Sequence, residues 1–281
     1  MKMEFLQETQ DIWSRLQRET RPIVLYGMGD GADKILRVFA EKQIRASGVF
    51  ASDEFVRGHS FAGFQVKKLS DIVQEFGEDI VIVLSFASQR PELLERFYEL
   101  DAQFDLAAPD VPVAGEGLFD LEFLQAHAEE FEQAYAYMAD EISRQVFADI
   151  INFKISGKID YLRHCETDKD EIFASVLKPH TQEHFVDLGA YNGDTIRELL
   201  SYTGGEYATI TALEPDRRNF RKLSKYAEEH LDAERIQIVQ AGSWSEDRTL
   251  TFAAKAGRNS ALAGEGTPTQ MRALDSVLGG A

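Results

Sequence analysis

Two stretches of the chain repeat one order of features: a short apolar run, a glycine-rich turn, a helical segment, and a second apolar run followed by an acidic residue. The first stretch opens with the apolar run 23–26 and the second with 185–188. Strands that alternate with helices indicate parallel sheets with helices on both faces. The sequence therefore predicts an α/β protein with two doubly wound, Rossmann-like domains joined by a helical connector.

The predicted boundaries lie where the residue pattern changes. Apolar residues recur at helical spacing between 3 and 19, which indicates a short amphipathic helix near the N-terminus. The first α/β domain is expected to end with a strand at 106–111, and residues 249–252 alternate like an edge strand of the second. Four parts are predicted: an N-terminal helix over 1–20, a Rossmann-like accessory domain over 21–112, a helical connector over 113–182, and a second α/β domain over 183–281.

The predicted connector has a helical period from 119 to 157. One apolar stripe along it is expected to pack as core against a neighbouring part of the chain. That stripe consists of Leu124, Phe131, Tyr135, Met138, Ile142 and Val146. The polar residues 158–184 are expected to be irregular.

Composition excludes several classes of protein. The chain of 281 residues has a formal net charge of −18, which disfavours binding to nucleic acid or to anionic membranes. A single cysteine, Cys165, excludes an internal disulfide and a zinc site with several cysteines. No apolar run reaches the ~20 residues that span a bilayer, and the N-terminus lacks the features of a signal peptide. We expect a cytoplasmic protein without a membrane span.

The first glycine turn, with Gly27, Gly29 and Gly31, fits the pattern of a dinucleotide site, and Asp53 follows the next predicted strand as a candidate ribose ligand. Asp30 lies inside this turn, where a carboxylate would repel phosphate. Two interpretations remain: a site for NAD or a nucleotide sugar, or a turn kept for tight packing of strand against helix.

The second turn, from Asp187 to Asp194, also carries acids where phosphate would sit. This suits a cofactor without phosphate, such as S-adenosylmethionine. Asp187 could attract its ammonium group, and Glu214, at the end of the next strand, could accept hydrogen bonds from the ribose hydroxyls. Gly189 would let the cofactor lie against the backbone, and the ring of Tyr191 could face the sulfonium. The alternative is again a structural turn.

The helix after this turn is expected to begin with a side-chain cap. Asp194 can cap it, and Thr195 with Glu198 has the spacing of a capping box.

Several motifs of the second half resemble the FkbM family of methyltransferases, over roughly 183–278. They are FVDLGAYNGDT at 185–195, ALEPDRRNF at 212–220, GSWS at 242–245, LTF at 250–252, Asn259-Ser260 and Leu274-Asp275. The resemblance implies a class I methyltransferase fold that binds S-adenosylmethionine. It implies methyl transfer to a hydroxyl group of a sugar, a glycan or a secondary metabolite.

By the same resemblance, the cofactor contacts fall on three segments. Asp187, Gly189 and Gly193 would line the methionine side of the cofactor. Glu214 would hold its ribose, and residues 241–243 would flank its adenine. The expected cofactor-binding residues are Asp187, Gly189, Ala190, Tyr191, Asn192, Gly193, Glu214, Pro215, Gly242 and Ser243. The family continues past its Leu-Asp pair to further strands, so the domain is expected to be incomplete at its C-terminus.

The remaining reactive side chains give no clear catalytic group. His164, His180 and His184 are more typical of surface or packing histidines, Cys165 has no activating neighbours, and no metal is expected. Trp244 could cover the adenine or pack in the core. We assign no general base. The rival hypotheses are an enzyme that binds NAD or a nucleotide sugar at the first turn, and a binding protein without catalysis.

Overall fold

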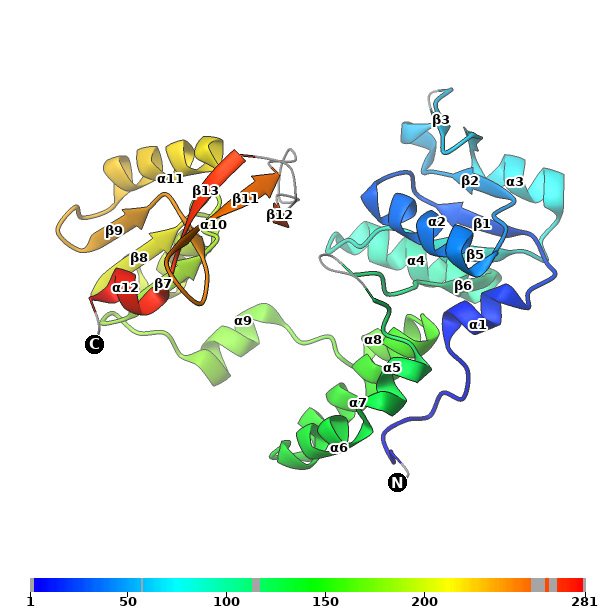
Figure 1. The fold of residues 1–281 in the computed structure, drawn as a ribbon, viewed down its shortest axis with the longest axis horizontal. Helices are drawn as coiled ribbons and strands as arrows, with labels where there is room; N and C mark the ends of the chain where they lie inside the picture. Colours follow the sequence, from blue (N-terminus) through cyan, green and yellow to red (C-terminus); the bar gives the residue numbers. More distant parts are fainter. Residues whose placement is uncertain (1–2, 57, 113–116, 254–260, 263–266, 280–281) are drawn as a thin grey trace. The chain divides into compact units, whose positions relative to one another are not determined.

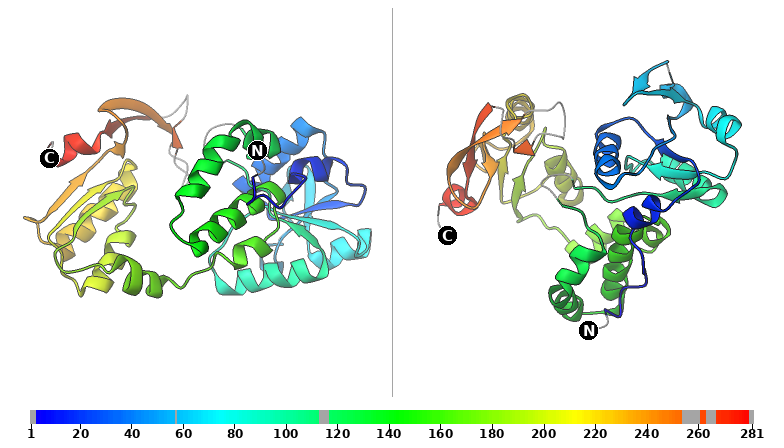
Figure 2. Two further views of the ribbon diagram at one scale, coloured as in Figure 1. Left: turned by 90° about the horizontal axis from the view of Figure 1, so that it is seen from below. Right: turned by 45° about the vertical axis from the view of Figure 1, so that its right-hand side comes forward.

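The computed structural model describes residues 3–56, 58–112, 117–253, 261–262 and 267–279. The chain divides into two compact units, Met1–Glu166 and Thr167–Ala281, and the elements of each can be followed in Figures 1 and 2. Both units are mixed α/β, and parallel pairing dominates the sheet of the first.

The N-terminal unit is built on a six-stranded sheet in the order β3-β4-β2-β1-β5-β6. All its pairings are parallel except that of β3 with β4. Its strands are β1 (Ile23–Tyr26), β2 (Gly48–Phe50), β3 (Ser60–Phe61), β4 (Phe64–Lys67), β5 (Val81–Leu84) and β6 (Asp105–Ala107). The last of these is shorter than the predicted 106–111 strand.

Helices cover both faces of this sheet, as Figure 1 shows. On one face, Ile35 and Phe39 of α2 (Asp30–Lys42) pack with Leu25 of β1. On the other, α3 (Leu69–Phe76) and α4 (Pro91–Gln103) pack against Tyr26 and Ile82. Alternate residues of the central strands thus face opposite helices, and both faces of the sheet are buried.

The N-terminal helix is shorter than expected. Only α1 (Ile12–Gln17) is helical, with Asp11 as its N-cap accepting a hydrogen bond from the Ser14 N–H at 2.9 Å. Upstream, the Gln7 N–H donates to the side-chain oxygen of Asn152 at 2.7 Å. The segment before α1 is therefore hydrogen-bonded to a residue far along the chain, and it does not form part of the N-terminal helix.

Four helices follow the sheet within the same unit: α5 (Leu121–Ala126), α6 (Ala128–Tyr137), α7 (Glu141–Ser156) and α8 (Asp160–Arg163). They are tied to the sheet, since the Ala108 N–H donates to the Gly157 carbonyl at 2.7 Å. The predicted apolar stripe is only partly core: Leu124 is buried, but Ile142 is 78% exposed. The predicted stripe is not buried along its whole length because the segment consists of separate helices, so a single apolar face does not continue from one helix to the next.

The C-terminal unit begins with α9 (Lys169–Glu171) and a π-helical segment, η2 (Ile172–Leu177). Part of the region expected to be irregular is thus helical. A parallel three-stranded sheet follows, with β8 (Thr209–Leu213) between β7 (His184–Leu188) and β9 (Ile236–Val239). Leu223 of α11 (Arg217–His230) and Ile196 of α10 (Asp194–Thr203) pack with Ile210 of β8.

The described part of this unit also contains a second sheet of four strands, in the order β10-β13-β11-β12. Its strands are β10 (Gly242–Ser243), β11 (Arg248–Ala253), β12 (Ala261–Leu262) and β13 (Thr267–Arg272). The strand predicted at 249–252 is present as part of β11, but its predicted edge position is wrong, because β11 pairs with β12 on one side and β13 on the other. A short helix, α12 (Leu274–Leu278), follows β13.

Candidate functional site

The turn after β7 is anchored to the end of the neighbouring strand. Leu188 and Leu213 are paired at the ends of β7 and β8. The Leu213 carbonyl then accepts two hydrogen bonds, from the N–H groups of Gly189 at 2.8 Å and Ala190 at 2.9 Å. This fixes the second glycine turn at the carboxyl edge of the parallel sheet, where α/β folds commonly bind their ligands.

Glu214 joins this turn to the next one. Its side chain is buried, and one carboxylate oxygen accepts from the Tyr191 N–H at 2.8 Å while the other accepts from the Asp216 N–H at 2.7 Å. Burial raises the pKa of the Glu214 carboxyl, and the hydrogen bonds from Asp216 and Tyr191 oppose that rise. The carboxylate therefore orders two turns, and each of its oxygens retains a second lone pair that can accept from a ligand.

Asp187 has a different environment. It is 8% exposed, and its Oδ2 atom is buried with no hydrogen-bond partner in the part of the chain that the structure describes. Burial, with a smaller effect of the nearby Asp194 charge, raises the pKa of the Asp187 carboxyl to about 6. A buried carboxylate oxygen without a donor is costly, so this atom is suited to a donor that the protein itself does not supply.

The two glycines of this turn have different structural roles. Gly189 has φ +96°, and a Cβ atom built there would meet nothing within 4 Å. Gly193 has φ +84°, and its Cβ atom would lie 2.9 Å from Cδ1 of Tyr226. Gly193 is therefore required by the contact with α11, whereas Gly189 leaves space beside the backbone.

The other residues predicted by the resemblance lie near these two turns. Ala190 is fully buried, and Asn192 accepts two hydrogen bonds from the Arg197 guanidinium, through its carbonyl and its side-chain oxygen. A Cβ atom on Gly242 would lie 3.8 Å from Cβ of Pro215, so the structure brings the start of β10 close to the end of β8. Ser243 is exposed and follows directly. Trp244 is 41% exposed, which excludes it from the core.

The predicted side-chain cap of α10 is wrong. The N-cap residue is Gly193, with φ +84°, and it has no side chain to accept a hydrogen bond. Asp194 is already the first residue of the helix. The left-handed conformation of the glycine moves the helix start one residue earlier than capping preference predicts.

Sequence reasoning missed two side chains that shape the site. Tyr226 packs against Gly193, and the Met271 side chain lies 2.6 Å from a Cβ atom built on Gly242. Both contacts join segments far apart in the chain, and neither leaves a local pattern in the sequence.

The first glycine turn is largely explained by packing. A Cβ atom on Gly31 would lie 2.1 Å from the backbone oxygen of Ser85, and one on Gly27 would lie 2.6 Å from the Ser85 hydroxyl. Only Gly29 has open space around it. Asp30 pairs with Lys34 at 3.0 Å. Two of the three glycines are thus required by the close approach of α2 and β1 to the loop after β5.

Asp53 does not lie at the end of a strand. It begins a 3-10 turn, η1 (Asp53–Phe55), three residues beyond β2, and its carboxylate pairs with Lys68 at 3.1 Å. The residue lines a pocket of about 420 Å³ to which none of the three glycines contributes among the described residues.

The three histidines expected at the surface or in packing each lie beside a polar side chain. His164 lies 3.5 Å from Asp149, His180 lies 3.5 Å from Glu183, and His184 shares a hydrogen bond of 2.8 Å with Thr209. Burial raises the pKa of the Cys165 thiol, which disfavours the reactive thiolate. Within the described ranges, no three His, Cys, Asp or Glu residues form a group that could hold a metal ion.

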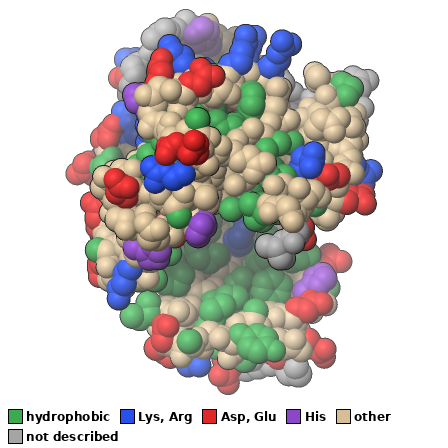
Figure 3. Space-filling model, turned by 90° about the vertical axis from the view of Figure 1, so that its left-hand side faces the viewer, with side chains coloured by type: hydrophobic (Ala, Val, Ile, Leu, Met, Phe, Trp, Pro, Cys, Tyr) green, Lys and Arg blue, Asp and Glu red, His purple; other side chains and the backbone are tan. Residues whose placement is uncertain are grey.

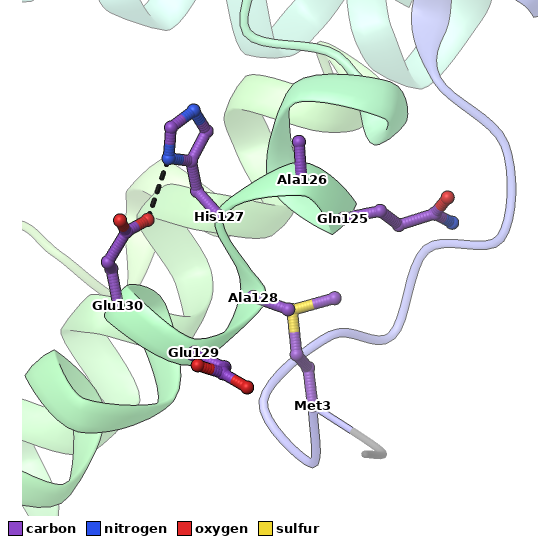
Figure 4. A pocket seen from close by; sticks show the side chains of 7 residues that line it. All are labelled: Met3, Gln125, Ala126, His127, Ala128, Glu129 and Glu130. Atoms are coloured by element: carbon purple, nitrogen blue, oxygen red, sulfur yellow. Dashed lines mark hydrogen bonds and ion pairs between the residues drawn. The ribbon is translucent and has the colours of Figure 1, made fainter.

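A pocket of about 470 Å³ beside α5 and α6 contains none of the predicted residues. Figure 4 shows His127 and Glu130 pointing toward each other at one side of it, 2.7 Å apart, with Met3 on the other side. Figure 3 shows acidic side chains spread over one face of the molecule, with Lys and Arg among them. No helix in the described part of the chain is long and apolar enough to cross a membrane.

Comparison with solved structures identifies one similar fold, the crystal structure of methyltransferase FkbM from Methylobacillus flagellatus KT. The two chains are 15% identical, with a TM-score of 0.65 over 92% of this chain and 70% of that one. No protein-family model matches the sequence, and no curated protein matches it either. At this identity the likeness establishes a shared mixed α/β fold.

Proposed function

We propose that the C-terminal unit binds S-adenosylmethionine at the turn after β7 and transfers its methyl group to a hydroxyl oxygen of a small-molecule or glycan acceptor. The observation that carries this proposal is the buried Asp187 Oδ2 atom, which has no hydrogen-bond donor among the described residues. The structural likeness to a methyltransferase supports it.

The residues present fit this cofactor. The orphaned Asp187 oxygen can accept a hydrogen bond from an ammonium group, and a charge-assisted bond would offset the cost of burying the carboxylate. The open space beside Gly189 lets a ligand lie against the backbone. Glu214 retains acceptor capacity on both oxygens for a ribose diol.

The charge of the turn favours a cofactor without phosphate. Asp187 and Asp194 both lie in or beside it, and burial together with the smaller effect of the Asp194 charge raises the pKa of the Asp187 carboxyl. A pyrophosphate placed here would add to that repulsion, whereas a ligand with an ammonium and a sulfonium group would relieve it. NAD is accordingly disfavoured at this turn.

When bound, the cofactor supplies a methyl carbon already activated by its sulfonium. The task of the protein is then to hold donor and acceptor in line and to exclude water. Asp187, Gly189 and Glu214 would fix the donor, and the rigid anchoring of the turn by the Leu213 carbonyl keeps their positions constant.

The test is a calorimetric titration of the chain with S-adenosylhomocysteine. We expect saturable binding that weakens at least tenfold in Glu214→Gln, because one oxygen that accepts hydrogen bonds becomes a donor group. Glu206→Gln is the matched control, since Glu206 is exposed just beyond α10. Absence of binding by the folded chain, or equal binding by the Glu214 variant, would contradict the proposal.

The rival enzyme that binds a dinucleotide at the first turn has less support. Gly27 and Gly31 are already explained by their contacts with Ser85, and Asp53 lies at a separate pocket. No residue of that turn has an orphaned buried oxygen comparable to that of Asp187 within the described residues.

A further inference from the structure

The N-terminal unit has an apolar groove along one side of α7, with a volume of about 460 Å³. Six apolar side chains and one hydroxyl line it: Met138, Ile142, Val146, Phe147, Ile150 and Ile151, with Ser143. Ile142 is 78% exposed, so the groove is open at this position among the described residues. Single exposed apolar side chains are ordinary on a protein surface, but a continuous apolar surface marks a site of interaction.

The groove exists because α7 is apolar on two sides. Ala148 and Ile155 are buried in the core with Leu124 of α5. Ile142 and Ile150 lie four residues before and after Val146, a spacing that places all three in one row along the helix. This row and the core residues lie at different angles around α7, so packing within the unit leaves the row uncovered.

The lining of the groove lacks the polar groups that orient a small ligand. Its one polar side chain is Ser143, whose hydroxyl donates to the Asp140 carboxylate at 3.0 Å and is therefore already used. No titratable side chain is among the described residues that line the groove. Small-molecule sites combine an apolar surface with a few placed polar groups. This groove is better matched to the apolar face of another polypeptide.

The charge around the groove selects the kind of polypeptide. Residues 120–156 contain eight Asp and Glu against two Lys and Arg. Both cations, Arg144 and Lys154, are paired with carboxylates. Asp140 and Glu141 are exposed and directly precede Ile142 in the chain. An acidic border attracts a basic partner, and it repels a second copy of this chain, which has a net charge of −18, as well as anionic lipid.

We propose that this groove docks a basic amphipathic helix of another protein. Apolar side chains spaced at i, i+4 and i+7 on that helix pack into the groove beside the row of Ile142, Val146 and Ile150. Its Lys and Arg side chains face Asp140 and Glu141. Met138, at one end of the groove, can adapt its side chain to the helix that binds. The proposal concerns the N-terminal unit alone and does not rest on methyl transfer.

The test is a fluorescence anisotropy titration of three labelled peptides of about 18 residues, a length of five helical turns, with the full chain. The first peptide has leucines on one helical face and lysines elsewhere. The second has the same composition with the leucines spread around the helix, and the third keeps the leucine face but has glutamate in place of lysine. We expect saturable one-to-one binding of the first peptide. The other two should bind at least tenfold more weakly, because one lacks the apolar face and the other the positive charge.

Two matched variants place the binding at the groove. Ile142→Ser should weaken binding of the first peptide at least tenfold, because it removes an apolar side chain that docking would bury. The side chain is exposed in the free protein, so the fold does not depend on it. Val176→Ser is the control, since Val176 is a 72% exposed aliphatic residue that does not line the groove. It should leave the affinity unchanged.

The proposal is overturned if the three peptides bind equally, if the first does not bind, or if Ile142→Ser leaves its affinity unchanged. Two further measurements identify a different occupant and would also overturn it. One is a dimer of the full chain in sedimentation that Ile142→Ser dissociates, and the other is saturable binding of dodecanoate that the same substitution abolishes. Titration of the same samples with S-adenosylhomocysteine reports on the C-terminal unit, so failure of either proposal is seen separately.

Discussion

At the scale of single residues, the two acids of the candidate site differ in a way that their sequence context does not reveal. Asp187 is the next-to-last residue of β7, Glu214 follows the last residue of β8, and both were predicted as cofactor ligands. Glu214 is satisfied by two backbone N–H groups, whereas one oxygen of Asp187 has no partner among the described residues. The difference depends on how the turns fold onto each other, because the donors come from residues on separate segments.

The raised pKa of Asp187 predicts how stability depends on pH. In the folded state the Asp187 carboxyl keeps its proton up to about pH 6, because its pKa is raised from the ordinary aspartate value of 3.8 to about 6. The folded state thus binds more protons than the unfolded chain between these values, and this carboxyl lowers stability as pH rises through that range. Asp187→Asn removes the ionisable group and therefore this loss of stability at higher pH.

We therefore expect the effect of Asp187→Asn on Tm to be more favourable at pH 7.5 than at pH 4. The difference should be a few degrees, corresponding to about 1 kcal/mol or more. Thermal unfolding of wild type and variant at the two pH values measures it. An effect of the substitution that is equal at both pH values would contradict a buried, ionisable Asp187.

At the scale of elements, the sequence predicts where glycine turns occur but not what each glycine does. The strand, turn and helix of both stretches were found where expected, because apolar periodicity and glycine are local signals. Whether a glycine makes room for a neighbouring segment or for a ligand is decided by contacts with residues far along the chain. Gly31 faces the Ser85 carbonyl, and Gly189 faces open space.

Alanine substitutions in the first turn test this distinction. Gly31→Ala should destabilise the N-terminal unit by more than about 2 kcal/mol, since its Cβ atom would lie 2.1 Å from a backbone oxygen. Gly29→Ala should change stability by less than about 0.5 kcal/mol, since its φ is ordinary and its surroundings are open. Denaturant unfolding of the two variants measures both. Similar losses would show that the close approach to Ser85 is not what Gly31 provides.

At the scale of the whole molecule, the alternation of strands and helices predicts the fold class correctly, and the mixed α/β architecture of the FkbM neighbour agrees with it. The mixed four-stranded sheet is where prediction failed. β13 contains Pro268 and polar residues, a weak strand signal, yet it pairs with β11 along five positions. Such pairing is set by tertiary contacts and not by local propensity. The expected Asn259-Ser260 turn lies outside the described residues.

The division into two compact units predicts separate unfolding. Calorimetry of the full chain should show two transitions, because a unit with its own core unfolds cooperatively by itself. S-Adenosylhomocysteine should raise the Tm of the C-terminal unit alone, by mass action on the unit that binds it. Gly31→Ala should lower the Tm of the N-terminal unit alone. A single transition that ligand and substitution both shift would contradict this division.

The affinity for S-adenosylhomocysteine as a function of pH tests the central claim most directly. If its ammonium group binds ionised Asp187, whose carboxyl has a pKa of about 6 without ligand, only about a tenth of the protein is competent at pH 5. We predict a Kd about tenfold weaker at pH 5 than at pH 7.5, and loss of this dependence in Asp187→Asn together with weaker binding at pH 7.5. Equal affinity at both pH values, or binding unchanged by the substitution, would contradict the assignment of the cofactor to this turn.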